Sequence, residues 1–413
     1  MTKKPFFNMG AKPRLMYPVL LRGEAAALRE IPLSARATLF CPEGAMLSLK
    51  RGDRMRTGQR IDLGANEAQI LISTVTGAVA DVSVHKGPYG RSFQALSLDV
   101  DEEDEFDEEL GKTLPLLNCL PGSPDFGTTA RGDGSVHTWV VTAQDKDLLI
   151  TTNQFLLHTR LDEVREGVKQ LRGLPGTDRV VIVVPPELFA LGEQTGAEVR
   201  TMQPVYPNAH HDLLLREMLG RDAASGGDGV GFLSVEAVIG LQTALCKGEP
   251  PVHKVLTVID KDLNAVHVRV RIGTPVKNIL DALGIKAGYG DRVVFGGPMT
   301  GEAIYGEDMP VLYDTDGLIV QDGDTIQPWC DASCVNCGEC IRACPARIPV
   351  NMLVRFLENG LYQEAANAYD LLSCIECGLC SYVCEARIPV FQYIMLGKVE
   401  FARKMDAEVA NAQ

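Results

Sequence analysis

Two cysteine-rich runs near the C-terminus constrain this chain more than any other feature of its sequence. Eight of the twelve cysteines lie between Cys334 and Cys384. The first run reads CVNCGECIRACPARIPV and the second reads CIECGLCSYVCEARIPV, with equivalent cysteines forty residues apart. An internal duplication of the pattern C-x-x-C-x-x-C-x-x-x-C is typical of a module that holds two 4Fe–4S clusters. This part of the chain must therefore fold around metal clusters.

The cysteine spacing also predicts which thiols share a cluster. In modules of this kind the first three cysteines of a run bind one cluster, and the fourth binds the cluster of the other run. We assign one 4Fe–4S cluster to Cys334, Cys337, Cys340 and Cys384. We assign the second to Cys344, Cys374, Cys377 and Cys380. The fourth cysteine of each run is expected at the start of a helix.

Paired C-x-x-C units also bind zinc, which is the main alternative for these runs. Structural zinc needs two pairs per ion and no third cysteine at the same short spacing, so iron–sulfur clusters are favoured. The second run departs from the usual pattern at Glu385, where the first run has Pro345, but no ligand is lost. Cys330 precedes the first ligand and is interpreted as a spare thiol. The isolated Cys41, Cys119 and Cys246 are interpreted as core or incidental positions.

Composition limits the class of protein. The chain has 413 residues, 46% of them hydrophobic and 23% charged, which describes a soluble globular protein of two to four domains. No apolar run is long enough to span a membrane, and the N-terminal residues do not resemble a secretory signal. A net charge of −14 argues against nucleic acid and anionic lipid as partners. Oxygen-sensitive clusters imply a reducing compartment, so we expect a cytoplasmic location.

The sequence pattern before the cysteine runs predicts a multidomain α/β protein. Residues 1–110 read as a basic arm, a module of short β-strands and an acidic linker, and the strands resemble the barrel-sandwich fold of lipoyl and biotinyl carriers. Residues 111–250 alternate buried strands such as VHTWVVTA and DRVVIVVP with amphipathic helices, as an α/β sandwich does. Residues 251–329 have the pattern of a β-grasp-like domain with one helix. Residues 330–413 form the α-helical dicluster ferredoxin module.

Several polar stretches have two interpretations each. Residues 99–109 carry nine acidic side chains in eleven positions, which predicts either a solvated linker or a docking surface for a basic partner. The glycine cluster at residues 225–232 predicts a turn, with a phosphate-binding loop as the alternative. His210 and His211 are expected at the surface. No G-x-G-x-x-G fingerprint of dinucleotide-binding folds is present.

Beyond these patterns, residues 252–400 closely resemble the RnfC family, the C subunits of Rnf-type ion-translocating electron transport complexes. The shared stretches are RIGTPV (271–276), GGPM (296–299) and CIECGLCSYVCEARIPVFQYIMLGK (374–398). Weaker similarity extends over GDRMRTGQ, STVTGAV and YPNAHHDLLLREML (206–219). The resemblance implies a barrel-sandwich hybrid module, a complex-I-flavoprotein-like α/β domain, a ligand-binding type of β-grasp domain and a dicluster ferredoxin domain. It also implies a peripheral subunit on the cytoplasmic face of the inner membrane, held there by integral partners.

The sequence departs from that family where a flavin would bind. Family members that react with NAD carry a G-x-G-G-A-G-F-P loop and an E-C-E-P-Y stretch, but here the corresponding residues are PDFGTTARGDGS (124–135) and AQDKDLLITTN (143–153). Without the glycines, backbone amides cannot approach a phosphate or an isoalloxazine ring closely. The FMN and NADH site is therefore expected to be degenerate, and FMN is not expected as a cofactor.

Together these observations predict an iron–sulfur electron-transfer subunit with no catalytic acid, base or nucleophile of its own. Its expected partners are the other subunits of a membrane redox complex and a soluble electron carrier or dehydrogenase. The alternative from the enzyme class is an NADH- or cobalamin-reducing flavoprotein with a non-standard FMN site. A zinc-stabilised scaffold is the alternative from the interaction class.

Overall fold

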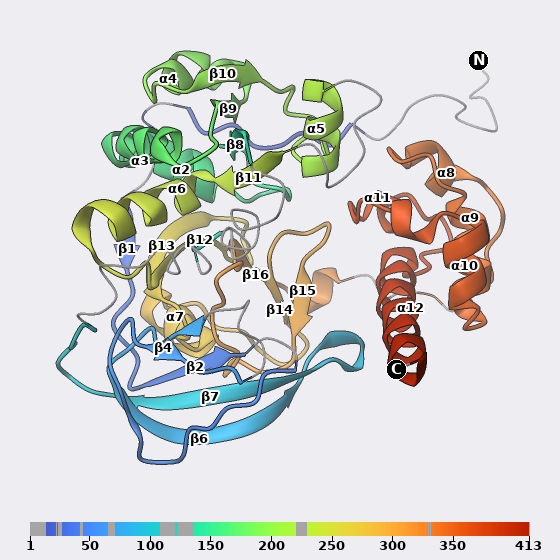
Figure 1. Cartoon of the computed structure of the whole chain (residues 1–413). Helices are drawn as coiled ribbons and strands as arrows, with labels where there is room; N and C mark the ends of the chain where they lie inside the picture. The colour runs from blue at the N-terminus through green and yellow to red at the C-terminus, as the bar shows by residue number, and fades with distance from the viewer. Residues whose placement is uncertain are drawn as a thin grey trace. The chain divides into compact units, whose positions relative to one another are not determined.

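The computed structural model describes residues 14–21, 23, 27–41, 44–64, 71–107, 120–122, 136–219, 229–326, 328, 330 and 332–412. The chain forms two compact units (Figure 1). The larger unit consists of Tyr17–Pro204 and His211–Asp324. The smaller unit consists of Met1–Met16, Val205–His210 and Thr325–Gln413. The smaller unit therefore combines stretches that are far apart in the sequence.

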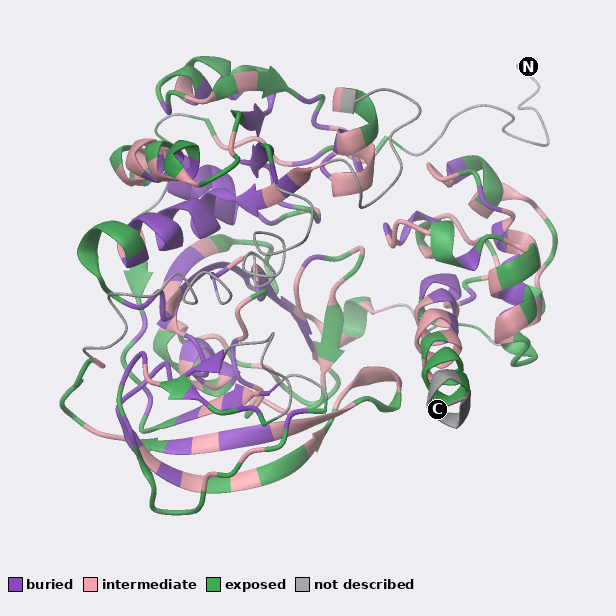
Figure 2. Ribbon diagram, in the orientation of Figure 1, coloured by how far each residue is buried: buried purple, intermediate pink, exposed green. Residues whose placement is uncertain are grey.

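A parallel sheet forms the most deeply buried part of the larger unit. Its order is β10-β9-β8-β11, and every neighbouring pair is parallel. The strands are β8 (Thr138–Thr142), β9 (Arg179–Val184), β10 (Glu198–Thr201) and β11 (Val230–Ser234). All of β8 is buried, and in β9 only Arg179 is exposed (Figure 2). The buried parallel strands predicted from VHTWVVTA and DRVVIVVP are confirmed, since a strand covered on both faces reads as a continuous apolar run.

The helices connected to this sheet are α2 (Thr152–Thr159), α3 (Leu161–Gly173), α4 (Phe189–Glu193), α5 (His211–Leu219) and α6 (Val235–Gln242). The amphipathic pattern of LLHTRLDEVREGVKQL predicts one helix, but the structure is interrupted at Arg160, whose backbone is not helical. Helix α6 is buried along its whole length (Figure 2). Gly167 of α3 makes the close crossing with α6 possible, because a Cβ there would lie 2.5 Å from the carbonyl oxygen of Val238.

A second layer of the larger unit is an antiparallel sheet of order β2-β7-β6-β3, together with the pair β4-β5. The strands are β2 (Arg36–Phe40), β3 (Arg54–Met55), β4 (Arg60–Ile61), β5 (Leu71–Ile72), β6 (Gly77–Lys86) and β7 (Ser92–Val100). Alternate side chains such as Ala37, Leu39, Leu96 and Leu98 point into its core. The short strands predicted for this part of the sequence are present.

The acidic stretch is folded against this sheet over residues 99–107, the part that the structure describes. Four carboxylates pair with arginines of the same unit: Asp99 with Arg36, Asp101 with Arg54, Asp104 with Arg271 and Glu105 with Arg56. Burial alone would raise the pKa of Asp104, but the Thr57 hydroxyl and the Arg271 guanidinium lower it overall. Four of the seven acidic side chains at residues 99–107 are thus paired within the chain, so this segment is held against the sheet rather than forming a free linker.

The third sheet of the larger unit is mixed, with the order β1-β13-β12-β16-β14-β15. Its strands are β1 (Arg29–Glu30), β12 (His253–Ile259), β13 (Ala265–Arg271), β14 (Arg292–Phe295), β15 (Glu302–Ile304) and β16 (Gly317–Gln321). Helix α7 (Val276–Leu283) packs on the sheet through Val276, Ile279 and Leu280. Strand β1 pairs in parallel with β13, so the described end of the N-terminal arm docks on the body of the protein.

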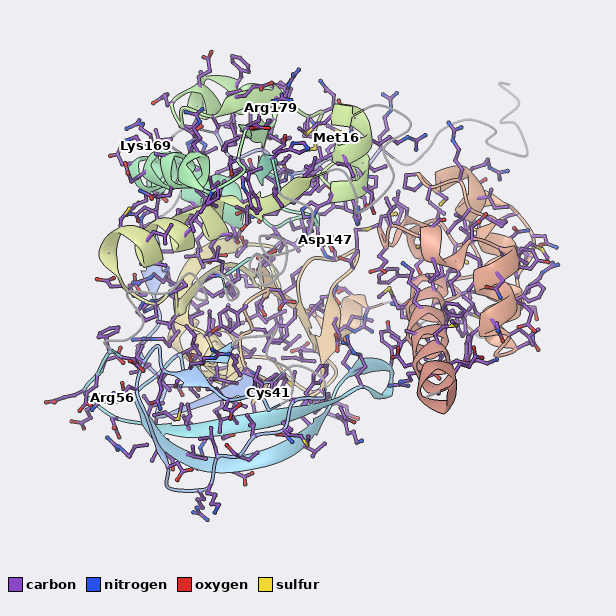
Figure 3. The ribbon with its side chains drawn as sticks, in the orientation of Figure 1. Met16, Cys41, Arg56, Asp147, Lys169 and Arg179 are labelled. Atoms are coloured by element: carbon purple, nitrogen blue, oxygen red, sulfur yellow. The ribbon has the colours of Figure 1, made fainter. Side chains whose placement is uncertain are left out.

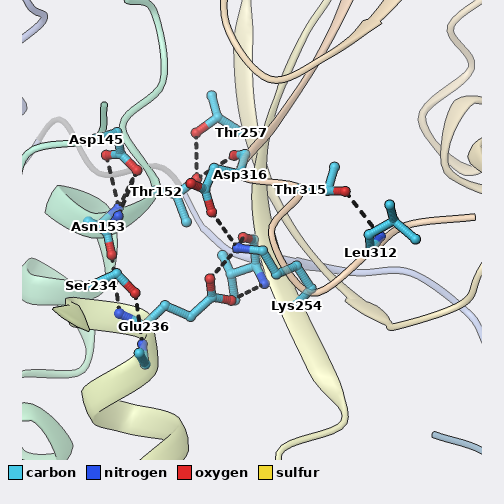
Figure 4. Close-up of polar contacts among 12 residues, drawn as sticks. Asp145, Thr152, Asn153, Ser234, Glu236, Lys254, Thr257, Leu312, Thr315 and Asp316 are labelled. Atoms are coloured by element: carbon cyan, nitrogen blue, oxygen red, sulfur yellow. Dashed lines mark hydrogen bonds and ion pairs between the residues drawn. The ribbon is translucent and has the colours of Figure 1, made fainter. Parts of the chain in front are cut away.

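A buried ion network connects α6 with the mixed sheet (Figure 4). The Lys254 side chain is fully buried on β12 and donates to Glu236 and, over 2.8 Å, to Asp316. The backbone N–H of Val255 donates to the second oxygen of Glu236 over 2.6 Å. Burial alone would lower the pKa of Lys254, but the two carboxylates raise it overall, so the ammonium stays charged. These ion pairs and hydrogen bonds link helix α6, beside the parallel sheet, to the mixed sheet.

The smaller unit is helical. It contains α8 (Glu339–Ala343), α9 (Val350–Glu358), α10 (Tyr362–Ala368), α11 (Leu379–Tyr382) and the long α12 (Val390–Ala412, red in Figure 1). The helical stretch predicted between the cysteine runs is divided into α9 and α10 near Gly360, which has a φ of 69°. The predicted final helix is confirmed as α12.

The fold is a mixed α/β multidomain arrangement with a helical cysteine-bearing module, as predicted. None of the helices in the described part of the chain combines the length and the apolar character that a membrane span requires.

Candidate iron–sulfur centre

The two cysteine loops have left-handed backbone turns at equivalent positions. Asn336 and Gly338 have φ values of 57° and 77°, and their counterparts Glu376 and Gly378 have 61° and 72°. These left-handed residues turn the chain between successive cysteines, so that three thiols of a run face one centre. Such a conformation is unfavourable for a glutamate, by about 1 kcal/mol, and it persists where the surroundings require it. The repeat in the sequence therefore corresponds to a repeated pair of left-handed turns in the backbone.

The fourth cysteine of each run follows a short helix. Cys344 comes directly after α8, and Cys384 comes two residues after α11. The prediction that these cysteines start a helix is wrong, because the next helices begin only at Val350 and Val390. The intervening Ala-Arg-Ile-Pro segment must first turn the chain.

The repeated Ala-Arg-Ile-Pro-Val segments make the same turn. The N–H of Arg347 donates to the carbonyl of Cys344, and the N–H of Arg387 donates to the carbonyl of Cys384. Both arginines have positive φ, 58° and 51°. The isoleucine and valine of each segment are at most 3% exposed and enter the core of the smaller unit. The repeated Ala-Arg-Ile-Pro-Val sequence thus forms an equivalent turn after each run, and each turn anchors the fourth cysteine of that run.

Charge interactions among the thiols cross between the two cysteine runs. Burial, followed by Cys334, Cys337 and Cys384, raises the pKa of Cys340 to about 11. Burial raises the pKa of Cys377 to about 12, and Cys374 and Cys344 add to that shift. Cys384 thus acts on Cys340 together with Cys334 and Cys337, and Cys344 acts on Cys377 together with Cys374. Cys340 also acts on Cys380, so the two sets of thiols influence each other as well. The influence of Cys384 on Cys340 and of Cys344 on Cys377 supports the crossed assignment made from the spacing.

The donor set fits iron–sulfur clusters. Raised pKa values arise here because several thiols crowd together in a partly buried space, and bound iron would favour their thiolate forms. Among the described residues, no three His, Cys, Asp or Glu side chains converge as they would around a single metal ion.

The second run is more enclosed than the first. Cys377 and Cys380 are each 8% exposed, whereas Val335, between two cysteines of the first run, is 65% exposed. The hydroxyl of Tyr206 donates to the carbonyl of Cys377 over 2.6 Å. The ammonium of Lys398 on α12 donates to the carbonyl of Cys374 over 2.7 Å and to Glu376 over 2.6 Å. The sequence alone does not single out either side chain, although both lie in stretches shared with the family.

Among the described residues, three further cysteines lie outside the two runs. Cys330 and Cys246 are exposed, and Cys41 is buried in the antiparallel sheet region, where burial raises its pKa to about 11. Cys119 lies outside the described residues. The spare-thiol interpretation of Cys330 stays a prediction.

The larger unit contains a cavity of about 560 Å³. Four carboxylates line it: Asp145, Asp147, Asp314 and Asp316. Asp147, which is labelled in Figure 3, accepts hydrogen bonds from the backbone N–H groups of Met299 and Thr300, and so holds the end of the GGPM stretch (296–299). Burial raises the pKa of Asp145 to about 8. The cavity is thus of ligand size but acidic.

Other predicted binding loops have mixed outcomes. Residues 124–135, which replace the family's flavin loop, lie outside the described residues, and so do residues 225–228 of the second glycine cluster. Gly231 and Phe232, at the end of that cluster, line the cavity. His210 and His211 are half-buried rather than at the surface, and the ring of His211 stacks on Phe232 at 4.3 Å between centroids.

The fold and the paired four-cysteine loops define a protein with a two-cluster iron–sulfur domain. The family described as "4Fe-4S dicluster domain" matches residues 333–388.

The chain as a whole is similar to the C subunits of ion-translocating oxidoreductase complexes, which confirms the resemblance found in the sequence. It is 25% identical over 356 residues to the C subunit of the proton-translocating ferredoxin:NAD(+) oxidoreductase complex of Clostridium ljungdahlii, covering 78% of each chain. It is 27% identical to the C subunit of the ion-translocating oxidoreductase complex of Pectobacterium carotovorum, covering 82% of this chain and 50% of that one. It is 26% identical to the C subunit of the ion-translocating oxidoreductase complex of Klebsiella pneumoniae, covering 88% of this chain and 53% of that one. The chain therefore spans about half the length of the latter two relatives.

Among solved structures, the chain resembles an NAD+-reducing nickel–iron hydrogenase in the air-oxidised state. The TM-score is 0.47 at 12% identity, over 72% of this chain and 62% of that one. For the hydrogen-reduced state of such a hydrogenase the TM-score is 0.46 at 13% identity, over 68% of this chain and 61% of that one. Likeness at this level does not indicate a function.

Proposed function

We propose that this chain is an electron-transfer subunit of an ion-translocating oxidoreductase complex and relays electrons through two 4Fe–4S clusters. The observation that carries the proposal is the pair of four-cysteine loops, which have left-handed residues at the same positions and thiols that act on one another across the runs. The relatives named as C subunits of such complexes support it. When bound, each cluster accepts and donates single electrons.

The cysteines proposed as ligands follow the crossed pattern. Cys334, Cys337, Cys340 and Cys384 hold the first cluster. Cys344, Cys374, Cys377 and Cys380 hold the second. The protein's own contribution is to position these thiols, limit the access of water and supply nearby charges, and no side chain needs to act as an acid or base. The surrounding core of Ile348, Leu353, Ile388 and Ile394 provides the apolar packing.

The proposed setting is the cytoplasmic face of the inner membrane, with the chain held by integral subunits of the complex. The proposed division of the chain is an arm, barrel-sandwich hybrid module and acidic segment (1–110), a complex-I-flavoprotein-like domain (111–250), a ligand-binding type of β-grasp domain (251–329) and a ferredoxin domain (330–413). The antiparallel, parallel and mixed sheets support this order. A soluble electron carrier or dehydrogenase would complete the set of partners.

Metal analysis after anaerobic purification tests the cluster content. We expect roughly eight iron and eight sulfide per chain, because two four-iron clusters need the eight thiolates that the runs provide. Iron, sulfide and zinc should be measured in the same sample. Stoichiometric zinc with little iron would show instead that the loops form a zinc-stabilised scaffold.

A flavoprotein that reduces cobalamin or reacts with NADH is the second candidate, and the cavity of about 560 Å³ favours it. Cavities of this size commonly bind cofactors. The acidic lining argues against FMN, because four carboxyl groups and only one lysine, Lys146, are among the described residues that line the cavity, which therefore offers a phosphate few cationic partners.

We therefore predict that the isolated protein binds no stoichiometric FMN and does not oxidise NADH. Flavin fluorescence of the denatured protein should stay near the background of a buffer control. NADH added anaerobically should leave the cluster absorbance unchanged, whereas dithionite should bleach it. One equivalent of flavin per chain, or bleaching by NADH without a partner protein, would favour the flavoprotein.

A further inference from the structure

The two cysteine loops share a backbone but differ in the charges around them. Forty residues separate equivalent positions, so Glu376 corresponds to Asn336 and Lys398 corresponds to Glu358. The helix after the second run thus carries an ammonium where the helix after the first run carries an exposed carboxylate. A symmetrical module would give both clusters the same surroundings, and this one does not.

Lys398 is placed firmly against the second loop. Its side chain is only 18% exposed, and its ammonium bonds both the carbonyl of Cys374 and the carboxylate of Glu376. The neighbouring Gly397 is buried against α9, where a Cβ would lie 2.4 Å from the side chain of Leu357. Close packing of α12 therefore holds Lys398 at this place.

We propose that Lys398 is a positioning residue that raises the reduction potential of the second cluster, and that Glu376 moderates this effect. The inference rests on the proposed cluster content. Reduction adds one negative charge to a cluster, and a nearby positive charge stabilises the reduced form. The interaction is only weakly screened, because the ammonium is mostly shielded from water. The pair would thus give two clusters of identical ligation different potentials.

Four variants test the signs of these two charges. Lys398→Gln should shift one of the two reduction steps to lower potential and leave the other in place. Lys398→Arg should keep the wild-type potential, since it keeps the charge. Glu376→Gln should shift the same step to higher potential. The double variant should return towards the wild type, because the removed charges are opposite.

The measurement is a redox titration followed by electron paramagnetic resonance, with iron counted in every sample. Lys404→Gln is the matched control, because Lys404 lies on the same helix, is exposed and bonds the side chain of Gln363 rather than either cysteine loop. Wild-type potentials in Lys398→Gln and Glu376→Gln at full iron content would overturn the inference while leaving the proposed function intact. If Lys398→Gln loses iron, Glu376→Gln decides, since an unchanged potential there contradicts the proposal. A wild-type chain without iron would refute the cluster content and this inference with it.

Discussion

Replacing Cys384 by alanine is expected to remove the cluster that is held mainly by the first cysteine run. The iron content should fall from about eight to about four atoms per chain, because one of two four-iron clusters loses a ligand. The physical reason is the grouping of the thiols, in which Cys384 acts on Cys340 although the two belong to different runs.

Double variants identify which cluster is lost. Cys334→Ala combined with Cys384→Ala should still retain about four iron atoms, since both thiols serve one cluster. Cys374→Ala combined with Cys384→Ala should leave almost none, since each change removes a different cluster. The reverse pattern would show that each run closes on its own cluster. Cys330→Ser is the matched control and should keep the full iron content, because Cys330 is an exposed thiol outside both groups.

Replacing Lys254 by methionine is expected to lower the free energy of unfolding of the larger unit by about 3–5 kcal/mol. The change strands Glu236 and Asp316 without the ammonium that neutralises them, in a place where Glu236 is almost fully buried. Denaturant unfolding followed by circular dichroism under anaerobic conditions measures the loss.

Two further variants separate charge from packing at Lys254. Adding Glu236→Gln should cost less than the sum of the single changes, because it removes a stranded carboxylate. Lys169→Met is the surface control: Lys169 pairs with Glu166 on α3 over 2.8 Å but is 62% exposed, so its loss should change stability little (Figure 3). A loss at Lys254 no larger than at Lys169 would contradict the structural role of the network.

Local patterns predicted the parts of the fold that depend on local rules. The apolar runs at Thr138–Thr142 and Arg179–Val184 are buried strands, as their composition indicates, and the cysteine spacing alone identified the metal-binding loops. The repeated Ala-Arg-Ile-Pro-Val segments indicated a shared structure, and the two turns have matching hydrogen bonds and backbone angles.

The features that could not be predicted depend on contacts between distant residues. Tyr206 is 171 residues from Cys377, and nothing in its local sequence indicates that its hydroxyl bonds that carbonyl. Lys254 lies within an apolar strand pattern, where a lysine is normally expected to face water, and its two carboxylate partners come from α6 and from a loop before β16. The acidic run suggested a linker by composition alone, but the matching arginines are dispersed along the sequence.

The unit that carries the proposed cluster ligands is made of segments that are separated in the sequence. This affects whether the unit can be transferred or isolated as one fragment. A fragment beginning at Thr325 would carry all eight proposed ligands but not Val205–His210. It would lack the hydroxyl of Tyr206 that bonds the carbonyl of Cys377, beside one of the most enclosed ligands. A simple ferredoxin domain is continuous in sequence, so it can be joined to another protein as one segment. Here the unit that carries the proposed ligands also includes residues from the middle of the chain, so a C-terminal fragment does not contain all of it.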